Sequence, residues 1–342
     1  MKNPKKKLRF NEKIVMVTGG AGYVGSVLLR KLLQAGYNVV CIDNLKFGGN
    51  SLIDIWDNPN FVFEKADITN YNVVYKIIQS YDIFAIVHLA AIVGDPACKL
   101  DPILATKTNQ DASINLLENA IKSKVQKFIF ASTCSNYGKM KDSNSYVDET
   151  SPLSPVSLYA ELKVGFEDIL LNKIKKIDGF CPTALRFATV FGMSPRMRFD
   201  LTVNEFTKEL ALGRELLVYG EQFWRPYCHV TDFSNAILLV ISAPEEKVAY
   251  NVFNVGDTSQ NYTKRIIIDE LLKQIPDGRV KYIHKEEDPR DYRVNFDKIQ
   301  NELQFKASKT VPEGINDILS SIRLGIIANP DDQRYYNIPI GE

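Results

Sequence analysis

Short apolar runs alternate with segments whose apolar residues recur every three or four positions through the first half of the chain. The runs predict buried strands of a parallel sheet, and the wider spacing predicts the helices that cover it. The predicted strands are 14–17, 38–42, 61–63, 84–89, 128–131 and 183–187, and the predicted helices are 24–33, 73–80, 102–123 and 157–177. The pattern predicts an α/β fold with a doubly wound parallel sheet that binds ligands at the carboxyl ends of its strands.

The pattern changes after about residue 193, where shorter strands mix with helices. The predicted strands there are 216–219, 227–230, 252–255 and 280–283, and the predicted helices lie near 201–212, 232–243, 262–274 and 313–325. A chain of 342 residues suits one large or two modest domains. We therefore predict a large domain over residues 1–192 and a smaller α/β lobe over 193–342. The chain is expected to cross between them more than once, so this boundary is approximate.

Three glycines follow the first predicted strand at a strict three-residue spacing, Gly19, Gly22 and Gly25. A helix that begins there directs free N–H groups and its positive dipole end to one point, which suits a pyrophosphate. Asp43 ends the second strand, close to the ~20 residues expected for the acid that binds the adenosine ribose. A carboxylate there favours NAD over NADP because it repels a 2′-phosphate. An ordinary turn with glycines used for packing is the alternative.

Tyr159 and Lys163 lie four residues apart on a predicted helix and therefore share one face. A nearby ammonium and an oxidised nicotinamide would lower the pKa of the phenol towards neutrality and make it a general base. Ser132 and Thr133 follow a buried strand, where a hydroxyl could bind a substrate hydroxyl. Each signal is weak by itself, and a half-buried tyrosine beside a solvated lysine is the alternative.

Composition excludes several classes of function. Lys and Arg total 42 and Asp and Glu 41, a net charge of +1 that gives no sign of nucleic-acid binding. No apolar stretch reaches the length of a membrane span. The five cysteines are odd in number, scattered and without a C-x-x-C pair, which predicts reduced thiols in a cytoplasmic protein and no metal site.

The motifs occur in an order that resembles the extended short-chain dehydrogenase/reductase family, the sugar-nucleotide epimerases and dehydratases. The resemblance covers roughly residues 14–325, nearly the whole chain. Its motifs are Gly19/Gly22/Gly25, Asp43-Asn44, Asp67-Ile68, His88–Ala91, Ser132–Gly138, Tyr159/Lys163, Leu185–Gly192 and Arg225–Asp232. The family implies a Rossmann-type sheet, an NAD cofactor and a nucleotide-diphosphate sugar substrate.

The resemblance also implies roles for individual residues. Tyr159 would be the catalytic base and acid, Lys163 would bind the cofactor ribose and lower the pKa of Tyr159, and Thr133 would be the catalytic threonine. Tyr159 and Lys163 are also implied to contact the cofactor. The other implied cofactor contacts are Gly19, Gly22, Tyr23, Val24, Gly25, Asp43, Asn44, Asp67, Ile68, Leu89, Ala90, Ala91 and Asn109. The implied substrate contacts are Thr133, Thr189, Arg198, Arg225 and Arg290, with Arg196 as a weaker candidate. His88 and His229 are interpreted as structural.

Three functions stay open. The first is a 4-epimerase that works through a transient 4-keto sugar, as in UDP-glucose 4-epimerases. The second is a sugar-nucleotide 4-dehydrogenase or 4-ketoreductase, because residues 192–201 resemble surface-polysaccharide enzymes that include oxidases of GDP-heptose. The third is a non-catalytic NAD sensor. Dehydration is disfavoured because Cys134 and Ser135 stand where dehydratases carry an Asp-Glu pair, and Thr189 stands where many hexose epimerases carry Asn. The helices near 102–123 and 157–177 resemble those that form the family's dimer.

Overall fold

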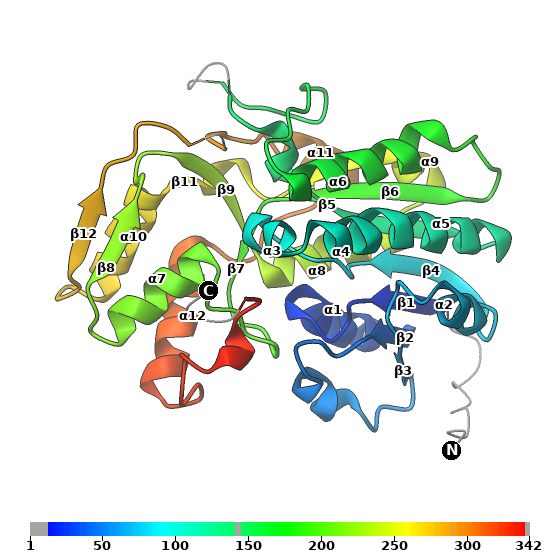
Figure 1. Ribbon diagram of the computed structural model, residues 1–342, viewed down its shortest axis with the longest axis horizontal. Coiled ribbons are helices and arrows are strands. Elements are labelled where there is room, and N and C mark those ends of the chain that lie inside the picture. The colour runs from blue at the N-terminus through cyan, green and yellow to red at the C-terminus, as the bar shows by residue number, and fades with distance from the viewer. Residues whose placement is uncertain (1–12, 141–144, 289, 339–342) are drawn as a thin grey trace.

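A parallel sheet of seven strands forms the centre of the computed structural model, which describes residues 13–140, 145–288 and 290–338. The strand order is β10-β6-β5-β4-β1-β2-β3. This arrangement confirms the predicted doubly wound fold (Figure 1). The bounds are β1 (Ile14–Thr18), β2 (Asn38–Asp43), β3 (Phe61–Lys65), β4 (Ile83–His88), β5 (Lys127–Thr133), β6 (Cys181–Phe187) and β10 (Asn251–Val255).

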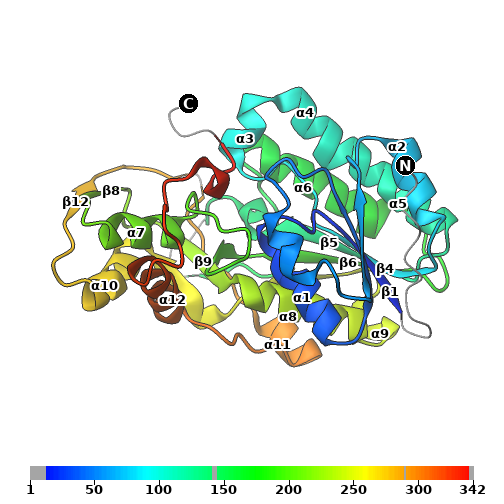
Figure 2. The same ribbon diagram turned by 90° about the horizontal axis from the view of Figure 1, so that it is seen from below.

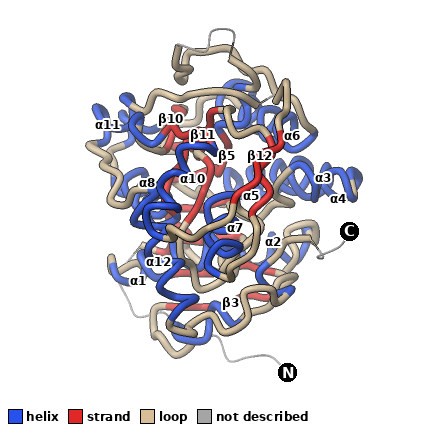
Figure 3. The backbone as a smooth tube through the Cα atoms, turned by 90° about the vertical axis from the view of Figure 1, so that its left-hand side faces the viewer, coloured by secondary structure: helices blue, strands red, loops and turns tan. Residues whose placement is uncertain are grey.

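Helices cover both faces of the sheet (Figures 2 and 3). Alternate side chains of β1 serve the two layers, because successive residues of a strand point to opposite faces. Val15 and Val17 pack in the core with α1 and α8, whereas Met16 packs in the core with α2, α5 and α6. The bounds are α1 (Tyr23–Gln34), α2 (Tyr71–Ile78), α5 (Ala112–Lys122), α6 (Leu158–Asp168) and α8 (Val230–Ser242).

The smaller lobe has its own core and lies on the left in Figure 1. It contains the strand groups β11-β9-β7 and β12-β8. The chain returns from this lobe to add α8, α9, β10 and α11 to the large domain. The domain boundary at residue 192 stays a prediction. The bounds are β7 (Thr189–Phe191), α7 (Thr202–Ala211), β8 (Leu216–Tyr219), β9 (Trp224–His229), α9 (Glu245–Val248), β11 (Asn261–Thr263), α10 (Lys264–Gln274), β12 (Val280–Ile283), α11 (Asp297–Leu303) and α12 (Val311–Arg323).

Two predicted helices differ from those observed. The helix predicted over 102–123 contains a π turn, Lys107–Asp111, between α4 (Pro102–Thr106) and α5, and a short helix that was not predicted, α3 (Asp95–Leu100), precedes it. The helix predicted to reach residue 177 ends at Lys173. The N–H of Ile177 donates to the Tyr250 hydroxyl instead of a helical carbonyl. Tertiary contacts thus override the local periodicity.

The strand predicted over 227–230 is also displaced. It ends at His229, and Val230 already begins α8. The Nδ1 atom of His229 accepts a hydrogen bond from the N–H of Thr231, so this side chain caps the helix. The cap satisfies one of the N–H groups that a helix start leaves free.

The register of the central strands brings three loops to one edge of the sheet. Thr18 of β1 lies opposite His88 of β4, and His88 lies opposite Phe130 of β5. The carboxyl ends of these strands are therefore level, or nearly so, along the sheet. The segments that follow them carry the glycine turn, the Leu89–Ala91 segment and the end of β5.

Candidate active site

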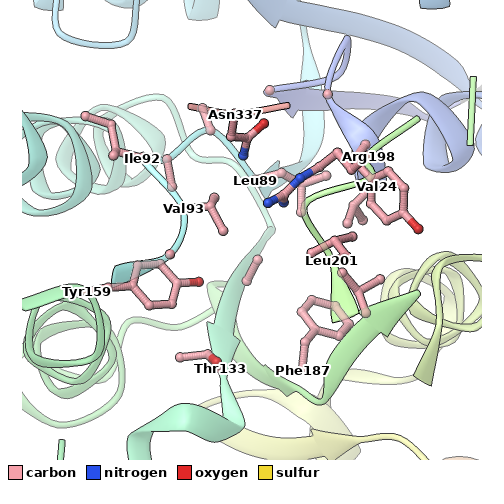
Figure 4. A pocket seen from close by; sticks show the side chains of 18 of the residues that line it. Val24, Leu89, Ile92, Val93, Thr133, Tyr159, Phe187, Arg198, Leu201 and Asn337 are labelled. Atoms are coloured by element: carbon pink, nitrogen blue, oxygen red, sulfur yellow. The ribbon is translucent and has the colours of Figure 1, made fainter. Parts of the chain in front are cut away.

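A cavity of about 670 Å³ opens at this edge of the sheet and is lined by both lobes. Figure 4 shows Tyr159 and Thr133 on its wall, with Arg198 and Leu201 on the opposite side. The structure brings nearly all of the predicted site together here. The predicted residues in the wall are Gly19, Gly22, Tyr23, Val24, Gly25, Asp43, Asn44, Asp67, Ile68, Leu89, Ala90, Ala91, Thr133, Tyr159, Lys163, Thr189, Arg196, Arg198, Arg225 and Arg290.

The glycine turn is shaped to admit a ligand. Gly19 has φ +74°, and a Cβ at Gly25 would lie 2.2 Å from the carbonyl oxygen of Gly19, so neither position suits a side chain. α1 begins directly after Gly22. Among the described residues, no side chain caps this helix start, and the first turn of α1 carries no acidic residue. Its N–H groups and positive dipole end are therefore available to a pyrophosphate.

Asp43 lies at the end of β2 beside this turn. Its two carboxylate oxygens accept hydrogen bonds from the N–H groups of Ala21 (3.0 Å) and Leu45 (2.8 Å). Burial raises the pKa of Asp43, and these two hydrogen bonds partly offset that effect. The bonds fix the carboxylate, whose remaining lone pairs can accept the hydroxyls of a ribose.

Tyr159 and Lys163 share one face of α6 as predicted. Lys163 is only 4% exposed, and its Nζ donates to the carbonyl oxygen of Ala131 at 2.7 Å. The ammonium lies 4.6 Å from the centre of the Phe130 ring and 5.9 Å from that of Tyr159. The hydrogen bond to β5 fixes the lysine beside the tyrosine in the cavity wall.

The predicted lowering of the Tyr159 pKa depends on a bound oxidised nicotinamide as well as on Lys163 and stays a prediction, because the protein without cofactor shows the opposite shift. Burial raises the pKa of Tyr159 above its ordinary value, and the cation that partly offsets this effect is Arg198 rather than Lys163. Burial also lowers the pKa of Lys163 to about 8. Desolvation disfavours the charged form of both groups, and it is the largest cause of each shift.

The two hydroxyls at the end of β5 have different surroundings. The Thr133 hydroxyl accepts a hydrogen bond from the N–H of Ser135 at 3.1 Å, and Thr133 lines the cavity. The Ser132 hydroxyl donates to Oε2 of Glu167 at 2.6 Å, in a buried ion pair with Arg186. Ser132 is thus bound into the core, which leaves Thr133 as the hydroxyl for a ligand.

The three arginines predicted to bind substrate line the cavity, and each is paired with a carboxylate. Arg198 lies between β7 and α7, Arg225 lies on β9, and Arg290 lies in the segment after β12. The pairs are Arg198–Asp200 at 2.7 Å, Arg225–Asp288 at 2.8 Å and Arg290–Asp95 at 2.8 Å.

Asn109, predicted to contact the cofactor, lies behind the cavity wall. It is 2% exposed and sits in the π turn between α4 and α5. Its side chain accepts from the N–H of Ile92 and donates to the carbonyl oxygen of the same residue, both at 2.8 Å. Asn109 therefore shapes the loop after β4, and its contact with the cofactor stays a prediction.

His88 has a structural environment. Its Nδ1 lies 2.8 Å from the Thr18 hydroxyl, and its Nε2 lies 2.8 Å from the Ser113 hydroxyl. Burial lowers the pKa of His88 to about 3, which keeps the ring neutral. The side chain ties β1 and β4 to α5.

The cavity also contains residues that the sequence did not single out, including Phe47 in the loop after β2 and Asn337 near the end of the described chain. Phe47 lies four residues after Asp43, so its neighbourhood gave a weak signal. Asn337 gave none, because no periodic segment surrounds it.

A family model described as the NAD dependent epimerase/dehydratase family matches residues 15–256, and the chain belongs to this family of NAD-dependent enzymes. The UDP-glucose 4-epimerase of Lacticaseibacillus casei is 27% identical over 89% of this chain and 99% of its own length. The dTDP-glucose 4,6-dehydratase of Streptomyces niveus is 28% identical over 88% and 90%. The structure of the Thermotoga maritima UDP-glucose 4-epimerase with UDP-glucose matches with a TM-score of 0.80 at 27% identity, over 92% and 99%.

The site fits the cofactor of the family. The free N–H groups at the start of α1 suit the pyrophosphate of NAD, and the fixed carboxylate of Asp43 suits its adenosine ribose. NAD supplies a hydride acceptor when bound. Within the described residues, no helix has the length and apolar character that crossing a membrane requires.

Proposed function

We propose that the protein is an NAD-dependent sugar-nucleotide epimerase that acts at the 4-position through a transient 4-keto sugar. The observation that carries the proposal is that the Tyr159 phenol and Thr133 lie in the same cavity wall as the glycine turn. Relatives that are UDP-glucose 4-epimerases support it. A family that also includes dehydratases and decarboxylases shares the fold, so the residues next to Thr133 must distinguish the reactions.

In this mechanism Tyr159 removes the proton of the sugar 4-hydroxyl and later returns it. Thr133 binds the same oxygen and positions it at the phenol. Arg198 provides positive charge that favours the phenolate, which burial alone would disfavour, and Lys163 lies beside the phenol on the same face of α6. General acid–base catalysis by a positioned side chain contributes roughly 10²–10⁴-fold to a rate.

The surroundings of Cys134 argue against dehydration. Its thiol is 1% exposed and donates to the carbonyl oxygen of Arg186 at 3.1 Å. Burial raises the pKa of Cys134 well above its ordinary value, so the thiol stays protonated at neutral pH and cannot act as a base. Ser135, which follows it, has no carboxylate. Neither residue replaces the acid and base that expel water.

The substrate class follows from the charges on the small-lobe side of the cavity. Arg225, Arg290 and Lys264 line this side and suit a nucleotide diphosphate. Their carboxylate partners, Asp288 and Asp95, would give way to the diphosphate oxygens. The sugar then extends from this anchor towards Tyr159.

We also propose a homodimer through the helices near 102–123 and 157–177, in the cytoplasm. Leu100, Ile103 and Leu104 are 65%, 82% and 39% exposed on α3 and α4, and neighbouring exposed apolar side chains mark an interaction site. Ile103→Glu is expected to convert the dimer to a monomer in light scattering. A wild-type protein that is already monomeric contradicts the dimer.

A panel of UDP- and GDP-sugars, incubated with the purified protein without added reductant, tests the reaction. A 4-epimer formed without net reduction of NAD is the expected product. A released 4-keto sugar with stoichiometric NADH indicates the 4-dehydrogenase or 4-ketoreductase instead. If no member of the panel is converted, the epimerase proposal fails.

Tyr159→Phe separates enzyme from sensor. The change removes the proton acceptor, so turnover is expected to fall roughly 10²–10⁴-fold while NAD binding persists. Tyr75→Phe, at an exposed tyrosine of α2, is the matched control. Unchanged biological function in Tyr159→Phe would favour an NAD-sensing protein.

A further inference from the structure

Two segments distant in sequence contribute to one part of the cavity wall, which we call the cover. The cover consists of residues 196–201 and 333–338. The N–H of Phe199 donates to the carbonyl oxygen of Tyr335 at 2.9 Å, and the two rings meet edge to face. Lys208 holds the same segment because its Nζ donates to the Tyr336 hydroxyl at 2.7 Å. The cover is thus fixed to α7.

The cover brings two unpaired polar atoms to the cavity. Nε of Arg196 and Oδ1 of Asn337 are buried without a hydrogen-bond partner, and both residues line the cavity. Among the described residues, these are the two such atoms whose residues lie in this wall. Figure 4 shows Asn337 between Ile92 and Arg198. Native proteins pair nearly all buried polar atoms, so a donor and an acceptor left free in one cavity indicate a ligand.

Arg196 lies at the adenosine end of the cavity. Its guanidinium is 4.4 Å from the centre of the Phe47 ring, in the loop that follows Asp43. Arg196 and Asp43 also act on one another electrostatically, each favouring the charged form of the other. One Nη of Arg196 donates to the carbonyl oxygen of Tyr336, which leaves Nε free. The residue is 6% exposed and lies in the cavity wall.

We propose that Arg196 and Asn337 bind the dinucleotide from the cover and retain it between turnovers. A ribose hydroxyl both donates and accepts, so one hydroxyl can donate to Asp43 and accept from Nε of Arg196. Oδ1 of Asn337 accepts from a hydroxyl or amide of the same ligand. With the glycine turn on one side and the cover on the other, the dinucleotide leaves only when the cover moves.

The dissociation rate of NAD tests this proposal. The full chain is loaded with NAD and mixed with excess etheno-NAD, a fluorescent analogue, and the exchange is followed by its fluorescence. Arg196→Gln and Asn337→Ala are each expected to accelerate release roughly tenfold or more, because each loses a buried hydrogen bond to the ligand. Arg334→Gln is the matched control, since this arginine lies in the same segment, pairs with Asp332 and does not line the cavity.

The outcomes separate the cover from the sugar chemistry. Unchanged release in both variants, with folding verified by thermal unfolding, overturns the proposal. So does a loss of affinity confined to UDP-sugars, which would assign the two atoms to the substrate. The assay needs no turnover. The cover proposal can therefore fail while the epimerase proposal stands, and the epimerase proposal can fail while the cover proposal stands.

Discussion

Nη1 of Arg290 lies 2.8 Å from Oδ2 of Asp95 and joins the segment after β12 to the start of α3. The other oxygen of Asp95 accepts a hydrogen bond from the Ser157 hydroxyl at 2.6 Å. Ser157 caps α6, two residues before Tyr159. The ion pair therefore connects a predicted substrate arginine to the helix that carries the predicted base. The Arg290 side chain is 40% exposed, so the pair is worth only about 0–1 kcal/mol and can be displaced by a ligand.

Removing the charge of Arg290 is expected to weaken nucleotide-sugar binding, whereas removing the charge of Asp95 is expected to strengthen it. Arg290→Gln loses a contact to the diphosphate and should raise the Kd roughly tenfold. Asp95→Asn removes the competing carboxylate but keeps an oxygen for Ser157, so the Kd should fall by about two- to fivefold. Calorimetry with a UDP-sugar measures both, and Asp54→Asn in the exposed pair with Arg30 is the control. Equal weakening by both variants would contradict displacement.

The lowered pKa of Lys163 predicts a specific pH dependence of stability. Above pH 8 the folded protein releases the Lys163 proton, whereas the unfolded chain keeps it up to about pH 10.5. The unfolded state then binds more protons, so this group makes stability rise with pH across that window. Urea unfolding should show that Lys163→Met loses this rise, and its stability relative to wild type should decline by roughly 3 kcal/mol between about pH 7 and pH 10.5. If the difference in stability between Lys163→Met and wild type does not change with pH, Lys163 has an ordinary lysine pKa in the folded protein.

Gly25→Ala is expected to abolish NAD binding. Its Cβ would lie 2.6 Å from the Cα of Gly20 as well as against Gly19, so the turn cannot close. Gly165→Ala, on α6, is the matched control, because nothing lies within 4 Å of its added Cβ. The control should keep NAD affinity and gain about 0.5–1 kcal/mol of stability from helix propensity. NAD titration by fluorescence measures both, and normal binding by Gly25→Ala would exclude the close approach.

Glu167→Gln should destabilise the fold strongly. Glu167 and Arg186 are each nearly buried, with side chains 5% and 6% exposed, and Nε of Arg186 donates to Glu167 at 3.0 Å. Neutralising the acid leaves a buried guanidinium without its counterion, which costs about 3–5 kcal/mol. Urea unfolding measures the loss. The control is Asp168→Asn. Asp168 follows Glu167 in the chain and forms an exposed ion pair with Lys173, so this change should alter the free energy of unfolding by about 1 kcal/mol or less.

The local sequence pattern determined several elements of the fold and several groups of the site. The strand, glycine turn and helix of residues 14–34 follow from short-range features: an apolar run, positions without Cβ and a periodic apolar face. The same holds for Asp43 at the end of β2 and for the Tyr159/Lys163 pair on α6. Strand ends of a parallel sheet meet at one edge, so the sequence also placed these groups in one site.

Long-range packing decided the rest. The sequence placed a phenol beside an ammonium, but only the folded cavity revealed that burial opposes the ionisation of Tyr159 and that Arg198 is the cation acting on it. Asn109 lies behind the wall because a π turn aims it at Ile92. Asn337 reaches the cavity only because its segment pairs with Phe199 far away in the chain. Desolvation and contacts between distant segments arise from the tertiary fold, and no periodicity along the chain encodes them.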